Sequence, residues 1–164
     1  LETGPPTVLD ADGLNLAAAM QWSLGEHILA TPHHGEIRRL LPDADNCAIR
    51  ADIADCFLAE HEAALIYKGA RTIVTQQGKP LFYNITGGPG MATAAHGDVL
   101  AGVCGGFMAQ GESLLVSAVL GTYLCGRASE IAISAGDSTQ QTLTAGDTLR
   151  HLPAAILSTS RLCY

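Results

Sequence analysis

Side chains able to bind ligands or move protons follow three short apolar segments of this sequence. The apolar segments are Val8-Leu9, Ile28–Ala30 and Ala63–Tyr67. The residues after them are, in order, two aspartates (Asp10 and Asp12), the stretch 31–36 with two histidines and a glutamate, and the stretch 68–72 with a lysine and an arginine. Ligands of open parallel α/β sheets bind beyond the carboxyl ends of the strands. If the apolar segments are neighbouring parallel strands, these side chains share one binding site.

A glycine-rich stretch leads into a segment with helical patterning. Gly87 to Gly90 precede a helix that we expect to begin near Asp98. The first N–H groups of a helix have no partner within the helix, and the helix dipole adds partial positive charge, so this turn suits a phosphate group. Asp98 is either a helix N-cap or a general base beside the bound phosphate. The spacing alone does not decide between these two interpretations.

The remaining pattern predicts the elements that hold these residues. Helical segments at about 14–24, 37–41 and 46–62 separate the three apolar segments, and strands that alternate with helices indicate a parallel α/β sheet. Segments 72–75 and 81–84 flank a glycine-containing connection and predict a hairpin at a sheet edge. Three further helices are expected over 98–110, 113–133 and 147–157, with a polar loop over 134–146.

Composition excludes several classes of function. The 164 residues fit one domain, and a hydrophobic content of 48% is ample for a core. The net charge of −7 argues against a nucleic-acid or anionic-membrane surface. The longest apolar stretch, 114–125, is shorter than a membrane span. Five cysteines without a C-x-x-C pair indicate reduced thiols in the cytoplasm, rather than a disulfide framework or a zinc site.

Four motifs in series resemble those of the NAD(P)H-hydrate dehydratase family, a branch of the ribokinase-like superfamily. They are Leu9–Asn15, Thr31–Glu36, Lys68–Thr72 and the segment from Gly90 to Leu100 that contains Gly97-Asp98. The resemblance covers nearly the whole chain. It implies a ribokinase-like three-layer α/β/α sandwich with a mostly parallel sheet. It also implies that residues 1–164 form a single domain that is the C-terminal portion of the family's domain, without its N-terminal part.

The resemblance also implies an activity, which is ADP-dependent dehydration of (S)-NAD(P)H-hydrate to NADH or NADPH, with release of AMP and phosphate. ADP (or ATP) is the phosphoryl donor, and Mg²⁺ is expected because it neutralises phosphate charge. The family pattern makes Asp98 the catalytic base, and it places His33 and Asp98 against the hydrated nicotinamide. Glu36 falls where related kinases hold magnesium through water. The nucleotide would contact Lys68, Gly69, Ala70, Arg71, Thr72 and Gly97.

The same resemblance frames the expected partners. They are small molecules, namely ADP and hydrated NADH or NADPH, with no nucleic acid and no membrane. A homo-oligomer is compatible with the family, as is a fused or separate NAD(P)H-hydrate epimerase.

Two alternative functions remain open at the level of sequence. One is a small-molecule kinase of the same superfamily, of the vitamin-precursor type, which shares the Gly97-Asp98 pair. The other is a nucleotide-binding module with impaired catalysis. Ala94-Ala95-His96 motivates the second alternative, because the family usually has Gly-Gly-Ser there. If either alanine needs a positive φ, the cost is about 1 kcal/mol.

Overall fold

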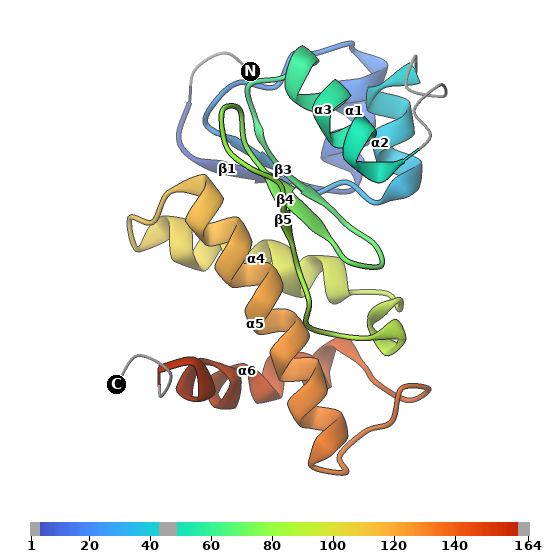
Figure 1. Cartoon of the computed structure of the whole chain (residues 1–164), viewed down its shortest axis with the longest axis vertical. Coiled ribbons are helices and arrows are strands. Elements are labelled where there is room, and N and C mark those ends of the chain that lie inside the picture. The colour runs from blue at the N-terminus through green and yellow to red at the C-terminus, as the bar shows by residue number, and fades with distance from the viewer. Residues whose placement is uncertain (1–3, 43–48, 161–164) are drawn as a thin grey trace.

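The computed structural model describes residues 4–42 and 49–160 (Figure 1). The elements follow in the order β1 (Thr7–Leu9), α1 (Asp12–Ala19), β2 (Ile28–Ala30), α2 (His34–Leu40), α3 (Arg50–Glu60), β3 (Ala64–Tyr67), β4 (Ile73–Thr75), β5 (Phe82–Tyr83), the 3-10 helix η2 (Pro89–Met91), α4 (His96–Ala109), α5 (Leu114–Ser134) and α6 (Ala145–Ser160).

One five-stranded sheet has the order β1-β2-β3-β4-β5. The three apolar segments form β1, β2 and β3, which are parallel neighbours as predicted. β4 then runs antiparallel to β3, and β5 pairs antiparallel with β4 to complete the predicted edge hairpin. Because the parallel strands are adjacent, the segments that follow them emerge at the same edge of the sheet.

Helices cover both faces of the sheet (Figure 1), which confirms the three-layer sandwich. Side chains of β3 alternate between the two faces, as a strand buried on both sides requires. Leu65 and Tyr67 lie in the core shared with α1, α2 and α3. Ala64 and Ile66 lie in the core shared with α4 and α5. All four are fully buried, so β3 is the central strand of the domain.

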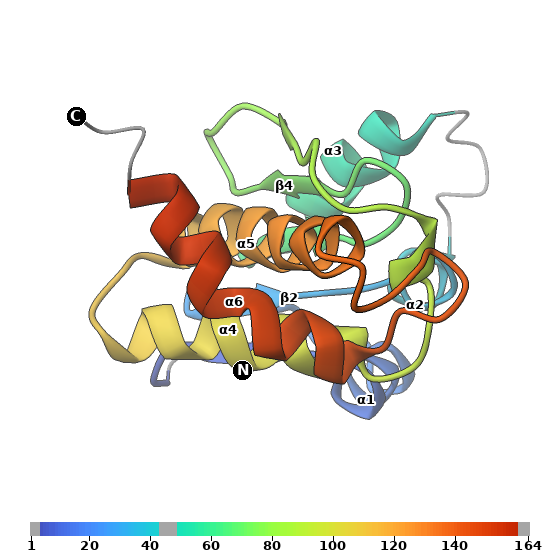
Figure 2. The same cartoon turned by 90° about the horizontal axis from the view of Figure 1, so that it is seen from below.

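α5 is the core helix of the second layer. It packs between α4 and α6 and contacts β2, β3 and β4. By length and composition alone it could cross a membrane, and a buried core helix meets the same criteria. Seen from below, α6 crosses α4 and α5 on the side away from the sheet (Figure 2). These contacts fix the first turn of α4 relative to the strand ends.

Several helix boundaries differ from the sequence prediction, and α1, α2, α4 and α6 each begin two or three residues earlier than expected. The helix expected over 14–24 ends at Ala19, because Gln21 adopts a left-handed conformation (φ 52°). The backbone N–H groups of Gln21 and Trp22 then donate to the carbonyls of Ala18 and Ala17, which closes the helix with a Schellman-type turn. α3 begins at Arg50; the first residues predicted for this helix lie outside the described residues.

Candidate functional site

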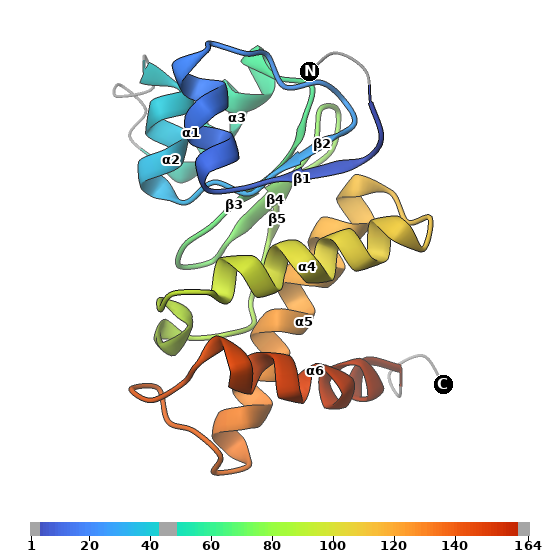
Figure 3. The same ribbon diagram turned by 180° about the vertical axis from the view of Figure 1, so that it is seen from behind.

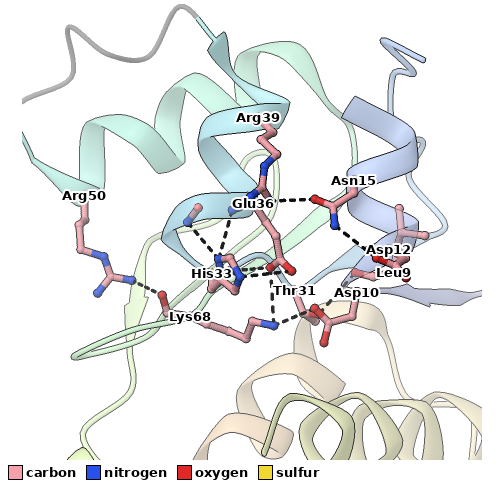
Figure 4. A network of polar contacts seen from close by, with 11 residues as sticks. Leu9, Asp10, Asp12, Asn15, Thr31, His33, Glu36, Arg39, Arg50 and Lys68 are labelled. Carbon is pink, nitrogen blue, oxygen red and sulfur yellow. Dashed lines mark hydrogen bonds and ion pairs between the residues drawn. The ribbon is translucent and has the colours of Figure 1, made fainter. Parts of the chain in front are cut away.

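The ends of the three parallel strands meet in one polar cluster (Figure 4). The Nζ atom of Lys68 lies 2.7 Å from Oδ1 of Asp10 and 3.9 Å from Oε2 of Glu36. The side chains of Lys68 and Asp10 are mostly buried, so solvent screens their attraction only partly. The side chains that follow the three strands therefore lie together, as predicted, and their role as one binding site stays a prediction. Asp12, in contrast, lies in the first turn of α1, where its carboxylate accepts a hydrogen bond from Asn15.

His33 is the N-cap of α2, and its contacts determine its tautomer. Its Nδ1 accepts hydrogen bonds from the backbone N–H groups of Gly35 (3.0 Å) and Glu36 (3.1 Å). An acceptor nitrogen carries no proton, so the proton of the neutral ring is on Nε2. The ring lines a cavity next to the cluster, which leaves His33 able to donate a hydrogen bond to a bound molecule.

Glu36 has structural contacts on both carboxylate oxygens. Oε2 accepts the backbone N–H of His33 at 2.8 Å, which completes a capping box, and Oε1 lies 3.5 Å from Nε2 of His33. The Lys68 ammonium lies between Glu36 and Asp10, where a directly ligated cation would have to sit. The described residues contain no cluster of three or more groups able to hold a metal. These oxygens do not fit direct ligation of Mg²⁺, and contact of Glu36 with the ion through water stays a prediction.

The cavity beside this cluster has a volume of about 890 Å³. Small-molecule sites span about 300–1,000 Å³. All six residues predicted to contact a nucleotide, Lys68 to Thr72 and Gly97, line the cavity, together with His33. Its other lining residues include Asn84, Thr86 to Pro89, Thr122 and Cys125. Residues from four separate parts of the chain thus form one concave site.

Gly97 joins the charged cluster to the first turn of α4, which runs beneath β1 (Figure 3). A side chain at Gly97 would come within 3.2 Å of Oδ2 of Asp10 and 3.5 Å of Nζ of Lys68. Glycine lets the backbone of α4 approach this ion pair without displacing the Asp10 carboxylate. The positive end of the helix dipole and the Lys68 ammonium consequently act on the same region.

The free backbone N–H groups lie further along the chain than the glycine-rich stretch suggested. Gly87 already donates to Oε1 of Glu130 (2.9 Å), and Gly90 donates to Oε1 of Gln140 (2.8 Å). The N–H groups of residues 93–98, however, donate to no other described residue. The two glycines therefore shape the loop, and the turn from Thr93 to Asp98 offers the donors.

Asp98 is the third residue of α4, since the helix begins at His96 and its N-cap is Ala95. The N-cap interpretation of Asp98 is therefore wrong. The Asp98 side chain is exposed, has no partner among the described residues and does not line the cavity. It comes directly after Gly97, which lines the cavity, on the first turn of α4. Its role as a base stays a prediction.

The ring of His96 is turned toward α5 and α6. Ser129 donates its hydroxyl hydrogen to the Cys125 carbonyl (2.9 Å), so it accepts from Thr148 (2.8 Å). Thr148 in turn must accept the Nε2 proton of His96 (3.1 Å), and Nδ1 of His96 accepts from Thr93 (3.0 Å). Every polar atom of the buried ring is satisfied in the neutral form. Through its hydrogen bond with Thr93 the ring stabilises this turn, and it forms part of the cavity wall.

Acid should destabilise the fold through two histidines. Burial lowers the pKa of His96 and of His61 from the ordinary value of 6.5. Below pH 6.5 the unfolded chain therefore binds protons that the folded chain does not, so the free energy of unfolding falls as pH falls. Urea denaturation at pH 7.5 and 5.0 should show this decrease, and His96→Asn should reduce it. Equal stability of the unaltered chain at both pH values would contradict the assignment.

The strain anticipated for the alanine pair is present at one position. Ala95 is left-handed (φ 68°, ψ −7°), whereas Ala94 does not have a positive φ. Ala95 is exposed, so a glycine there would lose no packing. Ala95→Gly should raise the free energy of unfolding by about 0.5–1 kcal/mol, because relief of the strain exceeds the added chain entropy. Thermal melting would measure this gain, and Ala94→Gly, which should not stabilise, is the control.

Sequence reasoning missed the residues that hold the cavity wall from a distance. Asn84 donates to the carbonyls of Thr86 (3.1 Å) and Thr122 (3.3 Å), and Glu130 and Gln140 hold the two glycines. Asn84 could have been suspected, since it ends a predicted strand. Nothing in the sequence distinguishes Glu130 and Gln140 from surface residues.

Comparison with known proteins assigns the family. The family model described as NAD(P)H-hydrate dehydratase matches residues 1–154. The chain belongs to the NAD(P)H-hydrate dehydratase family. It is 42% identical over 153 residues to a bifunctional NAD(P)H-hydrate repair enzyme of Moorella thermoacetica. This match covers 90% of this chain and 28% of the relative. It is 34% identical over 140 residues to an ADP-dependent (S)-NAD(P)H-hydrate dehydratase of Neisseria meningitidis, covering 79% of this chain and 46% of the relative.

Solved structures confirm the ribokinase-like fold. An ADP/ATP-dependent NAD(P)H-hydrate dehydratase from Bacillus subtilis, co-crystallized with ATP/Mg²⁺, superimposes with a TM-score of 0.82 at 24% identity, covering 96% of this chain and 58% of that one. A ribokinase-like superfamily protein from Enterococcus faecalis gives a TM-score of 0.72 at 26% identity, covering 90% and 51%. The chain thus spans about a third or less of the bifunctional relatives and roughly half of these structures.

Proposed function

We propose that the protein containing this chain dehydrates (S)-NAD(P)H-hydrate at the expense of ADP and thereby repairs NADH and NADPH in the cytoplasm. The observation that carries the proposal is the cavity beside α4, which all six residues matched to the family's nucleotide motifs line. The net charge of −7 is no obstacle, because Lys68, Arg71 and the free amides supply local positive potential.

In this proposal the cavity takes ADP, with its terminal phosphoryl group at the turn from Thr93 to Asp98 and near Lys68. The hydrated nicotinamide approaches from the Asp98 side of Gly97, with His33 as a hydrogen-bond donor. The two reactants therefore meet at the first turn of α4. This division accounts for the position of Asp98 outside the cavity.

The chemistry proceeds by activation of a poor leaving group. The hydroxyl oxygen on the nicotinamide ring attacks the terminal phosphorus of ADP, Asp98 accepts the hydroxyl proton, and the bond to AMP breaks. The amides of the turn and Lys68 stabilise the negative charge on the transferring phosphoryl group. The ring nitrogen then expels phosphate, and loss of a proton from the adjacent carbon restores the double bond.

The test is a direct assay of the complete protein. It is mixed with hydrated NADH, ADP and Mg²⁺, and the absorbance of the reduced nicotinamide is followed together with phosphate and AMP. Recovery of absorbance with one phosphate and one AMP per NADH supports the proposal. A stable phosphorylated product would instead indicate a kinase, and a folded protein that binds ADP without either product would indicate an impaired nucleotide-binding module.

A further inference from the structure

Arg50 holds the loop that carries the nucleotide motif. It is the first residue of α3, and its guanidinium group donates to three backbone carbonyls of the stretch 67–70. One nitrogen binds the carbonyls of Tyr67 (2.7 Å) and Lys68 (3.2 Å), and the other binds that of Ala70 (Figure 4 shows the contact with Lys68). The planar fork of arginine suits several acceptors at once.

These contacts determine where the amides of the loop point. In a planar trans peptide the C=O of one residue and the N–H of the next point in opposite directions. Because Arg50 binds the carbonyls of Tyr67, Lys68 and Ala70, the next N–H groups point away from the guanidinium. The first of them, that of Lys68, donates to the Pro32 carbonyl at 2.8 Å. The other two, those of Gly69 and Arg71, have no acceptor among the described residues, in a loop that lines the cavity.

The loop bound by Arg50 also has an unusual backbone conformation at two residues. Gly69 has φ 145° and Arg71 has φ 53°, so two of its residues occupy conformations that side chains disfavour. A side chain at Gly69 would come within 3.1 Å of the Arg50 guanidinium. The guanidinium in addition lies 4.2 Å from the centre of the Tyr67 ring, whose hydroxyl is 2.8 Å from Nδ1 of His34 in the cavity wall. Arg50 therefore contacts the backbone of this loop and the Tyr67 ring that precedes it.

Stabilisation of α3 does not account for an arginine at this position. A cation at the first residue of a helix opposes the dipole, and α3 has no side-chain cap to compensate. We propose that Arg50 is a positioning residue for nucleotide binding: it binds the carbonyls of the loop from behind, and it thereby presents the Gly69 and Arg71 amides and the Lys68 side chain to the phosphates. This inference rests on the proposed nucleotide site.

The first measurement needs no nucleotide. Hydrogen exchange of the Lys68 amide, which donates to Pro32, should become faster in Arg50→Met than in the unaltered complete protein. Arg50→Lys should give an intermediate rate, because one ammonium group cannot replace the fork. The control is Arg150→Lys, an exposed arginine paired with Asp147 on α6. Unchanged exchange at Lys68 in Arg50→Met would overturn the inference whether or not ADP binds.

The second measurement is ADP affinity by calorimetry and steady-state kinetics. Both Arg50 variants should weaken ADP binding about tenfold and raise KM for ADP to match, since oriented amides are lost. The KM for hydrated NADH should stay within about twofold of the unaltered value, whereas general unfolding would impair the use of both substrates. Arg150→Lys should behave as the unaltered protein. Equal ADP affinity in Arg50→Lys and the unaltered protein would overturn the positioning role. Absence of ADP binding by the unaltered protein would instead remove the proposed nucleotide site.

Discussion

Asp98→Asn is expected to lower kcat about a thousandfold while ADP binds as before. The amide keeps the shape of the side chain but cannot accept the hydroxyl proton, and general-base catalysis contributes about 10²–10⁴-fold. Because Asp98 does not line the cavity, its loss should leave the calorimetric ADP affinity within about twofold. Single-turnover formation of NADH from hydrated NADH measures the chemical step directly.

A matched control is available on another helix. Asp52 in α3 and Asp98 in α4 occupy the same position, the third residue of the helix, and both are exposed. Asp52→Asn removes the same charge from the same helical position, so it reports the loss of the interaction with the helix dipole alone. Turnover of Asp98→Asn at the level of Asp52→Asn would show that Asp98 is not the base.

Lys68→Met is the second substitution expected to have a large effect. It should weaken ADP binding by about ten- to a hundredfold, because a charge-assisted hydrogen bond to phosphate is lost. It should also lower the free energy of unfolding by about 1–3 kcal/mol, since Asp10 and Glu36 would lose the cation between them. Calorimetry and urea denaturation measure the two effects separately.

Two further variants separate binding from stability at this position. Lys79→Met removes an exposed lysine from the β4–β5 connection and should change neither quantity. Adding Asp10→Asn to Lys68→Met should recover stability, because one unpaired carboxylate is removed, but it should not recover ADP affinity. If the double variant binds ADP as tightly as the unaltered protein, Lys68 does not contact the nucleotide.

The sequence was most informative where local pattern and topology agree. Asp10, His33 and Lys68 each follow a short apolar strand, and adjacency of parallel strands is sufficient to bring them together. The alternation of strands and helices likewise predicted the layers. For Gly97, the motif predicted a contact with the nucleotide; the residue lines the cavity proposed for it, and the close approach to Asp10 favours a glycine there.

The sequence was uninformative where an interaction depends on tertiary structure. The end of α1 is set by Gln21 in a left-handed conformation, which glycine or asparagine would have signalled but glutamine does not. Arg50 reaches carbonyls 17–20 residues away, and any exposed helical arginine would look the same in the sequence. Burial of the His96 ring among Thr93, Thr148 and Ser129 likewise depends on how α6 crosses α5.

The contacts of Glu130 and Gln140 with the glycine-rich loop bear on when the site forms during folding. These side chains hold Gly87 and Gly90 from 43 and 50 residues further along the chain. Contacts between residues so distant in sequence close large loops, and they form late because the entropy of closure must first be overcome. The proposed nucleotide pocket therefore matures only after α5 and the loop that carries Gln140 have packed against the glycine-rich loop.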